Sequence, residues 1–167
     1  MEPRVSDAID LGSPKAPRSM ASDTLGSIWI LDHKGAKIAR IRPGGLKLET
    51  AWQGEDRLTS IAWDGRRMLA LDFKGRRVVE ICEANQLKTV AAGYLEKPVA
   101  LASDLLGRFA VMDEKAKTVT LFGRDGVSLG VHAMGEDGPS KVDGLVMYPA
   151  GGFGVVPGSG ATVYRFR

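Results

Sequence analysis

The stretch from Pro98 to Ala133 decides the fold, and its sequence is PVALASDLLGRFAVMDEKAKTVTLFGRDGVSLGVHA. Four short apolar runs alternate with polar segments that contain Asp, Gly and Lys; the runs cover residues 98–103, 108–112, 118–122 and 127–133. Such runs, bounded by turn residues, are typical of β-strands, and no run in the chain has the length and 3.6-residue period of a helix. The stretch therefore predicts four consecutive antiparallel strands joined by tight turns.

The same pattern occurs four times along the chain. Its clearest marker follows the second apolar run, at spacings of 40, 41 and 44 residues: Asp32, Asp72, Asp113 and Pro157. A period of about 41 residues indicates one supersecondary unit stacked on copies of itself. We expect repeats at about 15–54, 55–95, 96–137 and 142–167, which together form one domain over residues 15–167.

Stacked four-stranded sheets predict an all-β fold, a β-propeller with about four blades of four antiparallel strands. The last repeat has only three strand-like runs, and the segment Arg4–Leu11 precedes the first repeat. Residues 1–14 are therefore expected to be either an N-terminal strand that completes the last blade or a linker. A closing strand would remove sheet edges that otherwise invite aggregation.

The recurring aspartates have a local explanation. An Asp side chain accepts hydrogen bonds from backbone N–H groups a few residues later, which fixes a turn. We expect Asp32, Asp72 and Asp113 to be turn formers, with Gly35 and Gly75 supplying the positive φ of the hairpins. A second set follows the first strand of each blade, and it either caps those turns, which we favour, or forms a carboxylate ring for calcium: Asp23, Asp64 and Asp104.

Length and composition limit the classes of protein to which this chain can belong. The chain has 167 residues, 44% of them apolar, which is enough for one domain with a sizeable core. The net charge of +3 is too small to argue for nucleic acid. The single cysteine, Cys82, excludes an internal disulfide, and we expect a buried thiol there. No apolar run approaches 18 residues and no apolar leader follows Met1, which predicts no membrane span and favours a cytoplasmic location.

The sequence offers little catalytic chemistry. Its two histidines are His33 and His132, and no His, Cys or carboxylate run has the spacing of metal ligands. The string Gly126–Gly130 fits the G-x-S-x-G pattern of a nucleophile elbow, but it enters a strand and no helix follows. Small residues, Ala21, Ala62 and Ala102, occupy the first strands near the expected axis. We therefore expect no catalytic residue, no metal site and no cofactor.

The strongest positive signal lies in the second hairpin of each blade. Equivalent hairpins of a propeller emerge at one end of the molecule, and here they carry a basic rim with one aromatic residue: Lys34, Lys37, Phe73, Lys74, Arg76, Arg77, Lys115 and Lys117. This rim either steers an acidic protein or peptide partner or consists of solvated hairpin tips. Trp63, at the end of a first strand, either contacts a partner at the channel mouth or packs in the core.

The chain resembles the NHL-type repeat propellers. The resembling pattern is Ala102-Ser103-Asp104, then Gly107, an apolar strand ending at Asp113, and the apolar strand 119–122; it covers most of residues 15–167. The resemblance implies a platform that binds proteins. Such propellers usually have about six blades, so four repeats leave three alternatives: a compact four-bladed ring, a half completed by another copy or chain, or a piece of a longer propeller.

We therefore expect a non-catalytic interaction or scaffold module that binds a protein or peptide on one loop face. The alternative is a small-ligand, carbohydrate or metal sensor at the channel mouth, carried by Trp63 and Asp64. A propeller lyase or lactonase would need several convergent His, Asp or Glu side chains on the inner strands.

Overall fold

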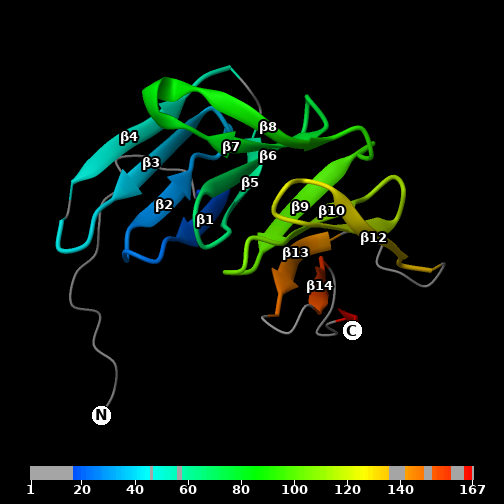
Figure 1. Ribbon diagram of the computed structural model, residues 1–167. Coiled ribbons are helices and arrows are strands. Elements are labelled where there is room, and N and C mark those ends of the chain that lie inside the picture. The colour runs from blue at the N-terminus through cyan, green and yellow to red at the C-terminus, as the bar shows by residue number, and fades with distance from the viewer. Residues whose placement is uncertain are drawn as a thin grey trace, which may run out of the picture.

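The computed structural model describes residues 17–45, 47–55, 58–135, 142–148, 152–158 and 164–166. These residues form four antiparallel sheets, three with four strands and one with three (Figure 1). In each sheet the strands are neighbours in chain order, so every sheet is a simple meander. The expected closing strand Arg4–Leu11 lies outside the described residues.

The sheets are named blades 1 to 4. Blade 1 contains β1 (Ser19–Ser22), β2 (Ile28–Leu31), β3 (Lys37–Ile41) and β4 (Leu48–Gln53). Blade 2 contains β5 (Leu58–Trp63), β6 (Met68–Asp72), β7 (Arg77–Ile81), the short 3₁₀ turn η1 (Glu83–Asn85) and β8 (Leu87–Ala92). Blade 3 contains β9 (Pro98–Ser103), β10 (Phe109–Asp113), β11 (Thr118–Phe122) and β12 (Ser128–Ala133). Blade 4 contains β13 (Val142–Met147), β14 (Phe153–Pro157) and β15 (Tyr164–Phe166).

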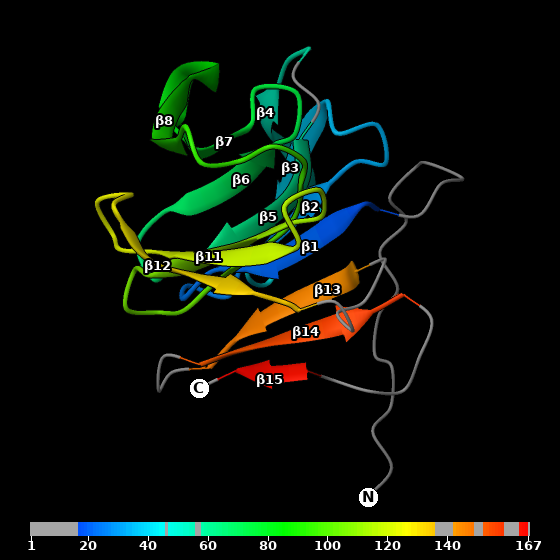
Figure 2. The same ribbon diagram turned by 90° about the vertical axis from the view of Figure 1, so that its right-hand side faces the viewer.

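The first strands of the blades, β1, β5, β9 and β13, form the inner edge of the molecule. Each packs beside the next. Figure 2 shows β1, β5 and β13 running in the same direction, and the contacts of Ser60 with Leu101 and of Trp63 with Ser103 set β9 parallel to β5. The strand pattern expected from the sequence is confirmed, including the three strands of the last repeat. No helix in the described residues is long and apolar enough to cross a membrane.

Apolar side chains between the sheets hold the blades together. Leu31, Ile38 and Trp52 pack against blade 2, while the rings of Phe109 and Phe122 stack 5.0 Å apart in the core between blades 2 and 3. A third core, which includes Met112, Val119 and Phe153, joins blades 3 and 4. Four blades thus share three cores, and no core among the described residues joins blade 4 to blade 1. In the described residues, the blades form an arc.

The predicted aspartate turns are confirmed. The Asp32 carboxylate accepts hydrogen bonds from the backbone N–H groups of Ala36 and Lys37, at 2.8 and 3.1 Å. Asp72 accepts from the N–H of Gly75 at 2.7 Å, and Asp113 from that of Ala116 at 2.9 Å. Each side chain thereby supplies an acceptor that the turn itself lacks.

The prediction for the two hairpin glycines is half right. Gly35 has a φ of +74°, and a Cβ there would lie 2.0 Å from the carbonyl oxygen of Leu58 in blade 2, so only glycine fits. Gly75 was expected to have a positive φ, but the following residue, Arg76, has it instead, at 51°. The equivalent residue of the next blade, Lys117, has a φ of 49°. The second and third hairpins therefore place the left-handed residue one position later than the first.

Candidate functional site

The hairpins between the second and third strands of blades 1, 2 and 3 project from one end of the arc. Because the inner strands are parallel and each sheet is a meander, the β2–β3, β6–β7 and β10–β11 hairpins must lie at the end where the inner strands begin. Contacts agree with this placement, since the N–H of Leu58, which begins β5, donates to the carbonyl of Gly35 at 2.9 Å. We call this end the hairpin face.

The basic rim on the hairpin face divides into paired and unpaired cations. Arg77 donates to the buried Asp72 carboxylate at 2.8 Å, and Lys115 pairs with Glu96 at 2.6 Å. The other rim cations form no ion pair with any described residue: Lys34, Lys37, Lys74, Arg76 and Lys117. Lys37 is half-buried and the other four are exposed. The rim is thus partly neutralised by its own molecule, and blades 1 to 3 each keep unpaired positive charge.

Two aromatic residues were also singled out in the sequence. Phe73 is exposed beside Lys74 at the tip of the β6–β7 hairpin. Trp63 ends β5 at the opposite end of the inner strands, so it does not lie with the rim. Its half-buried ring packs against the core between blades 1 and 2, and its indole N–H is buried without an acceptor among the described residues. The structure therefore brings Phe73 together with the basic rim and separates Trp63 from it.

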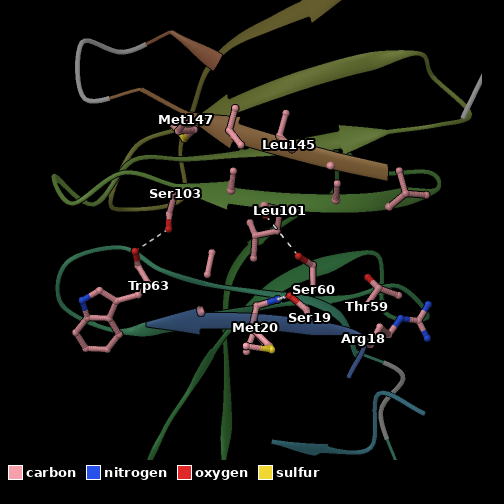
Figure 3. A pocket seen from close by; sticks show the side chains of 18 of the residues that line it. Arg18, Ser19, Met20, Thr59, Ser60, Trp63, Leu101, Ser103, Leu145 and Met147 are labelled. Atoms are coloured by element: carbon pink, nitrogen blue, oxygen red, sulfur yellow. Dashed lines mark hydrogen bonds between the residues drawn. The ribbon is translucent and has the colours of Figure 1, made fainter. Parts of the chain in front are cut away.

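A cavity of about 500 Å³ lies between the four inner strands (Figure 3). Its walls include Ala21, Ala62 and Ala102, the small residues that the sequence indicated near the axis. Volumes of this order can hold a small ligand. The polar groups on the wall therefore decide what the cavity can do.

Serine hydroxyls in this wall connect neighbouring blades. The Ser19 hydroxyl accepts from the N–H of Ile61 at 3.1 Å. The hydroxyls of Ser60 and Ser103 donate across the boundary between blades 2 and 3, to the carbonyls of Leu101 at 3.4 Å and of Trp63 at 2.8 Å (Figure 3). Each of these hydroxyls is therefore already hydrogen-bonded to the backbone of a neighbouring inner strand. Their contacts between blades were not predicted from the sequence.

The carboxylates of the first turns are also satisfied by their own blades. Asp64 accepts from two backbone N–H groups and from the Arg67 guanidinium at 2.8 Å, and Asp104 accepts from its own turn and from Arg108. The described residues contain no group of three or more His, Cys, Asp or Glu side chains that could hold a metal ion. Turn capping therefore explains these carboxylates.

The hydrogen bonds of such a turn change the pKa of its carboxylate, as Asp23 shows. It accepts hydrogen bonds from the N–H groups of Leu25 and Ser27 and from the Trp29 indole, at 3.0, 2.8 and 2.9 Å. Partial burial disfavours the ionised form and acts to raise the pKa of Asp23, but the hydrogen bonds from Trp29, Ser27 and Leu25 together outweigh it. The pKa of Asp23 is therefore lowered from its ordinary value.

The remaining chemical candidates lie apart from the cavity. His132 is on the outer strand β12, where its ring packs edge-on against Phe153 at 5.1 Å, and His33 is in the β2–β3 hairpin. Cys82 is a free, half-buried thiol, less buried than the sequence suggested. The G-x-S-x-G string ends inside β12, which confirms that it is no nucleophile elbow.

Two polar links between blades were also not predicted from the sequence. Arg67 of blade 2 pairs with Asp64, and it donates to the carbonyl of Arg124 in blade 3 at 2.5 Å. The Asn85 side chain of blade 2 holds the backbone of Gln53 in blade 1. Both links join residues far apart in the sequence, so no local pattern pointed to them.

No protein-family model matches the chain, and no curated protein is significantly similar to it. Solved structures do match. A streptogramin B lyase structure superposes with a TM-score of 0.69 at 10% identity over 93% of this chain. Virginiamycin B lyase from Staphylococcus aureus gives 0.71 at 12% identity over 94%, and a nidogen/laminin complex gives 0.73 at 17% identity over 90%.

The chain spans little more than half the length of these proteins, at 56%, 54% and 60% of the three matched chains. At such low identities the likeness concerns the fold alone. Two of the matched proteins are lyases and one is part of a protein complex, so the fold itself carries both catalysis and binding. The meander sheets, the parallel inner strands and these neighbours together show that the chain folds as blades of a β-propeller.

Proposed function

We propose that this chain is a non-catalytic interaction module that binds an acidic protein or peptide on its hairpin face. The observation that carries the proposal is the set of cations without an ion pair to any described residue, repeated at equivalent hairpins of three blades: Lys34, Lys37, Lys74, Arg76 and Lys117. Positive charges gathered at one end steer an acidic surface and favour its encounter. Phe73 adds an exposed aromatic contact between them.

Backbone strain is a second argument for a binding site on the hairpin face. Arg76 and Lys117 both hold positive φ angles, which side chains other than glycine adopt at a cost. A glycine at either position would remove that cost. Basic residues stand there instead, and strained residues cluster at functional sites.

The cavity between the inner strands gives less support for catalysis or for a small ligand. Its hydroxyls at Ser19, Ser60 and Ser103 are used between the blades. Neither histidine is among the residues that line it. General acid–base or nucleophilic catalysis needs such groups within reach of the substrate.

The test compares two charge reversals of equal size. The double variant Lys74→Glu with Arg76→Glu changes the hairpin face, and Lys47→Glu with Arg66→Glu changes two exposed cations outside the second hairpins. Binding of a fluorescein-labelled decaglutamate peptide is followed by anisotropy at low and at high salt. We expect wild-type binding that weakens with salt and is lost only in the first variant. Equal binding by both variants, or no wild-type binding, would overturn the proposal.

A further inference from the structure

Among the aromatic residues whose side chains the structure describes, Tyr94 and Phe73 are exposed, at 66% and 37%. Neither ring stacks on another described ring, and the Tyr94 hydroxyl forms no hydrogen bond with a described residue. Aromatic side chains are enriched where proteins bind partners. Tyr94 is therefore a candidate contact residue beside Phe73.

Tyr94 lies on the hairpin face, at the same end of blade 2 as Phe73. Strand β8 ends on this face at Ala92, which is paired with Arg77, and Arg77 is paired with Asp72. Phe73 follows Asp72 directly, and Tyr94 follows Ala92 by two residues. The two segments that carry the aromatic residues therefore leave the sheet two strand spacings apart, about 10 Å. One large side chain of a partner can contact both rings across that distance.

The backbone on either side of Tyr94 is fixed. Before Tyr94, β8 is paired with β7 up to its last residue. After Tyr94, Leu95 is buried in the core between blades 2 and 3. The N–H groups of Glu96 and Lys97 then donate to the Asp113 carboxylate, at 2.5 and 2.9 Å. A partner that contacts Tyr94 thus has to order little more than one side chain, which keeps the entropic cost of binding low.

The aromatic residue is particular to blade 2. In blades 1, 2 and 3 the last residue of the outer strand is paired with the first residue of the third strand, so these positions correspond. Two residues after that outer-strand position stand Glu55, Tyr94 and Gly135. Unpaired cations occur on all three blades, but the aromatic contact is available at blade 2 alone.

The charges around Tyr94 suit an acidic partner. Two carboxylates of the adjoining segments are neutralised, Glu96 by Lys115 and Glu114 by Lys97. The unpaired cations of the hairpin face stand in blade 2 itself and in blades 1 and 3 on either side of it. Positive charge therefore flanks the aromatic residues on both sides.

We infer that the partner is a peptide segment that carries one aromatic side chain with acidic residues on both sides of it. Its aromatic side chain contacts Tyr94 and Phe73, and its carboxylates meet the unpaired cations of the hairpin face. Aromatic anchors supply much of the binding energy of an interface, while charges steer the encounter. The inference rests on the proposed function and narrows the class of its partner.

The first test compares two fluorescein-labelled peptides of equal length and charge by anisotropy. Each has five glutamates on either side of a central residue, which is tryptophan in one peptide and serine in the other. We expect the wild type to bind both, and to bind the tryptophan peptide about tenfold more tightly, which corresponds to 1.4 kcal/mol. High salt should weaken both and preserve their ratio, because salt screens charges and not an apolar contact.

The two peptides also separate this inference from the proposed function. Equal affinity for both overturns the inference and leaves the proposed function standing. Binding of neither peptide overturns both.

The second test places the contact. Tyr94→Ser and Phe73→Ser should each reduce the preference for tryptophan over serine, and the double variant should abolish it with an unchanged circular dichroism spectrum. Tyr94→Phe keeps the ring and should keep the preference. The control is Leu105→Ser, which removes a side chain of similar exposure, 68%, from the β9–β10 turn at the opposite end of the blades. A preference that survives in the double variant, or that Leu105→Ser also abolishes, overturns the inference.

Discussion

The Asn85 side chain holds both backbone groups of Gln53, which lies 32 residues earlier. Its Oδ1 accepts from the Gln53 N–H and its Nδ2 donates to the Gln53 C=O, each at 2.6 Å. The amide thus copies the pairing that another strand would give the edge of β4. Asn85 has a φ of 63°, a conformation that Asn tolerates better than most residues.

The first prediction concerns this link. Asn85→Ala should lower the free energy of unfolding by about 1–2 kcal/mol, since two exposed hydrogen bonds are lost. Asn85→Gly, which tolerates the positive φ, separates hydrogen-bond loss from backbone strain. Urea denaturation measures both, with Gln86→Ala as the neighbouring exposed control. A loss confined to Asn85→Ala and absent in Asn85→Gly would mean that strain alone matters.

A second prediction tests how closely blades 2 and 3 approach. A Cβ at Gly126, where φ is +80°, would lie 1.9 Å from the carbonyl oxygen of Val90. Gly126→Ala should therefore cost about 2–4 kcal/mol, from backbone strain and overpacking. Gly93 has a φ of +92° with nothing within 4 Å of such a Cβ, so Gly93→Ala should cost only about 1 kcal/mol. Equal losses in thermal or urea unfolding would contradict the close approach.

The strands and their turns could be predicted because their causes are local. Alternation within β9 to β12 is local, and the hydrogen bonds that Asp32, Asp72 and Asp113 accept within their own hairpins come from residues at most five positions later. The hairpin of blade 2 shows the limit. Glycine adopts a positive φ easily, yet in this hairpin Arg76 has the positive φ and Gly75 does not. Hairpins differ in which position holds the left-handed residue, and the sequence does not show which geometry forms.

The ion pairs and the links between blades depend on which segments meet in space. No local pattern shows that Arg77 is paired or that Asn85 reaches Gln53. The serine contacts between the inner strands, by contrast, could have been predicted from the sequence. Ser60 and Leu101 are 41 residues apart, and Ser103 and Trp63 are 40 apart, which is one repeat. Residues one repeat apart on inner strands are neighbours, so the period alone could have indicated them.

The third prediction separates strain from charge at Arg76. Arg76→Gly should raise the free energy of unfolding by about 0.5–1 kcal/mol, because glycine adopts a φ of 51° without a steric penalty. The same change should weaken binding of the decaglutamate peptide, since one unpaired cation is lost. Lys74→Gly in the same hairpin removes the same charge without relieving a positive φ, and it should not stabilise the fold. Chemical denaturation and peptide anisotropy on both variants give the two readouts. If Arg76→Gly stabilises without weakening binding, Arg76 is a strained turn residue only.

The fourth prediction concerns the pH dependence of Asp23. The pKa of Asp23 is lowered in the folded chain, so folding favours its ionised form. Its contribution to stability should be fully present above the ordinary value of 3.8 and should be lost as pH falls through the lower, folded-state pKa. Wild type should therefore be more stable than Asp23→Asn at neutral pH, and the difference should shrink below pH 3.8.

The hydrogen bond from the Trp29 indole to Asp23 supplies a direct probe of the same titration. The Trp29 indole cross-peak in a ¹H–¹⁵N spectrum, assigned by Trp29→Phe, should move with a midpoint below 3.8 while the fold persists. Trp52 is buried in the apolar core, so its indole cross-peak should move only when the chain unfolds. A midpoint above 3.8, or a stability difference that stays constant to pH 2, would mean that burial outweighs the hydrogen bonds from Trp29, Ser27 and Leu25.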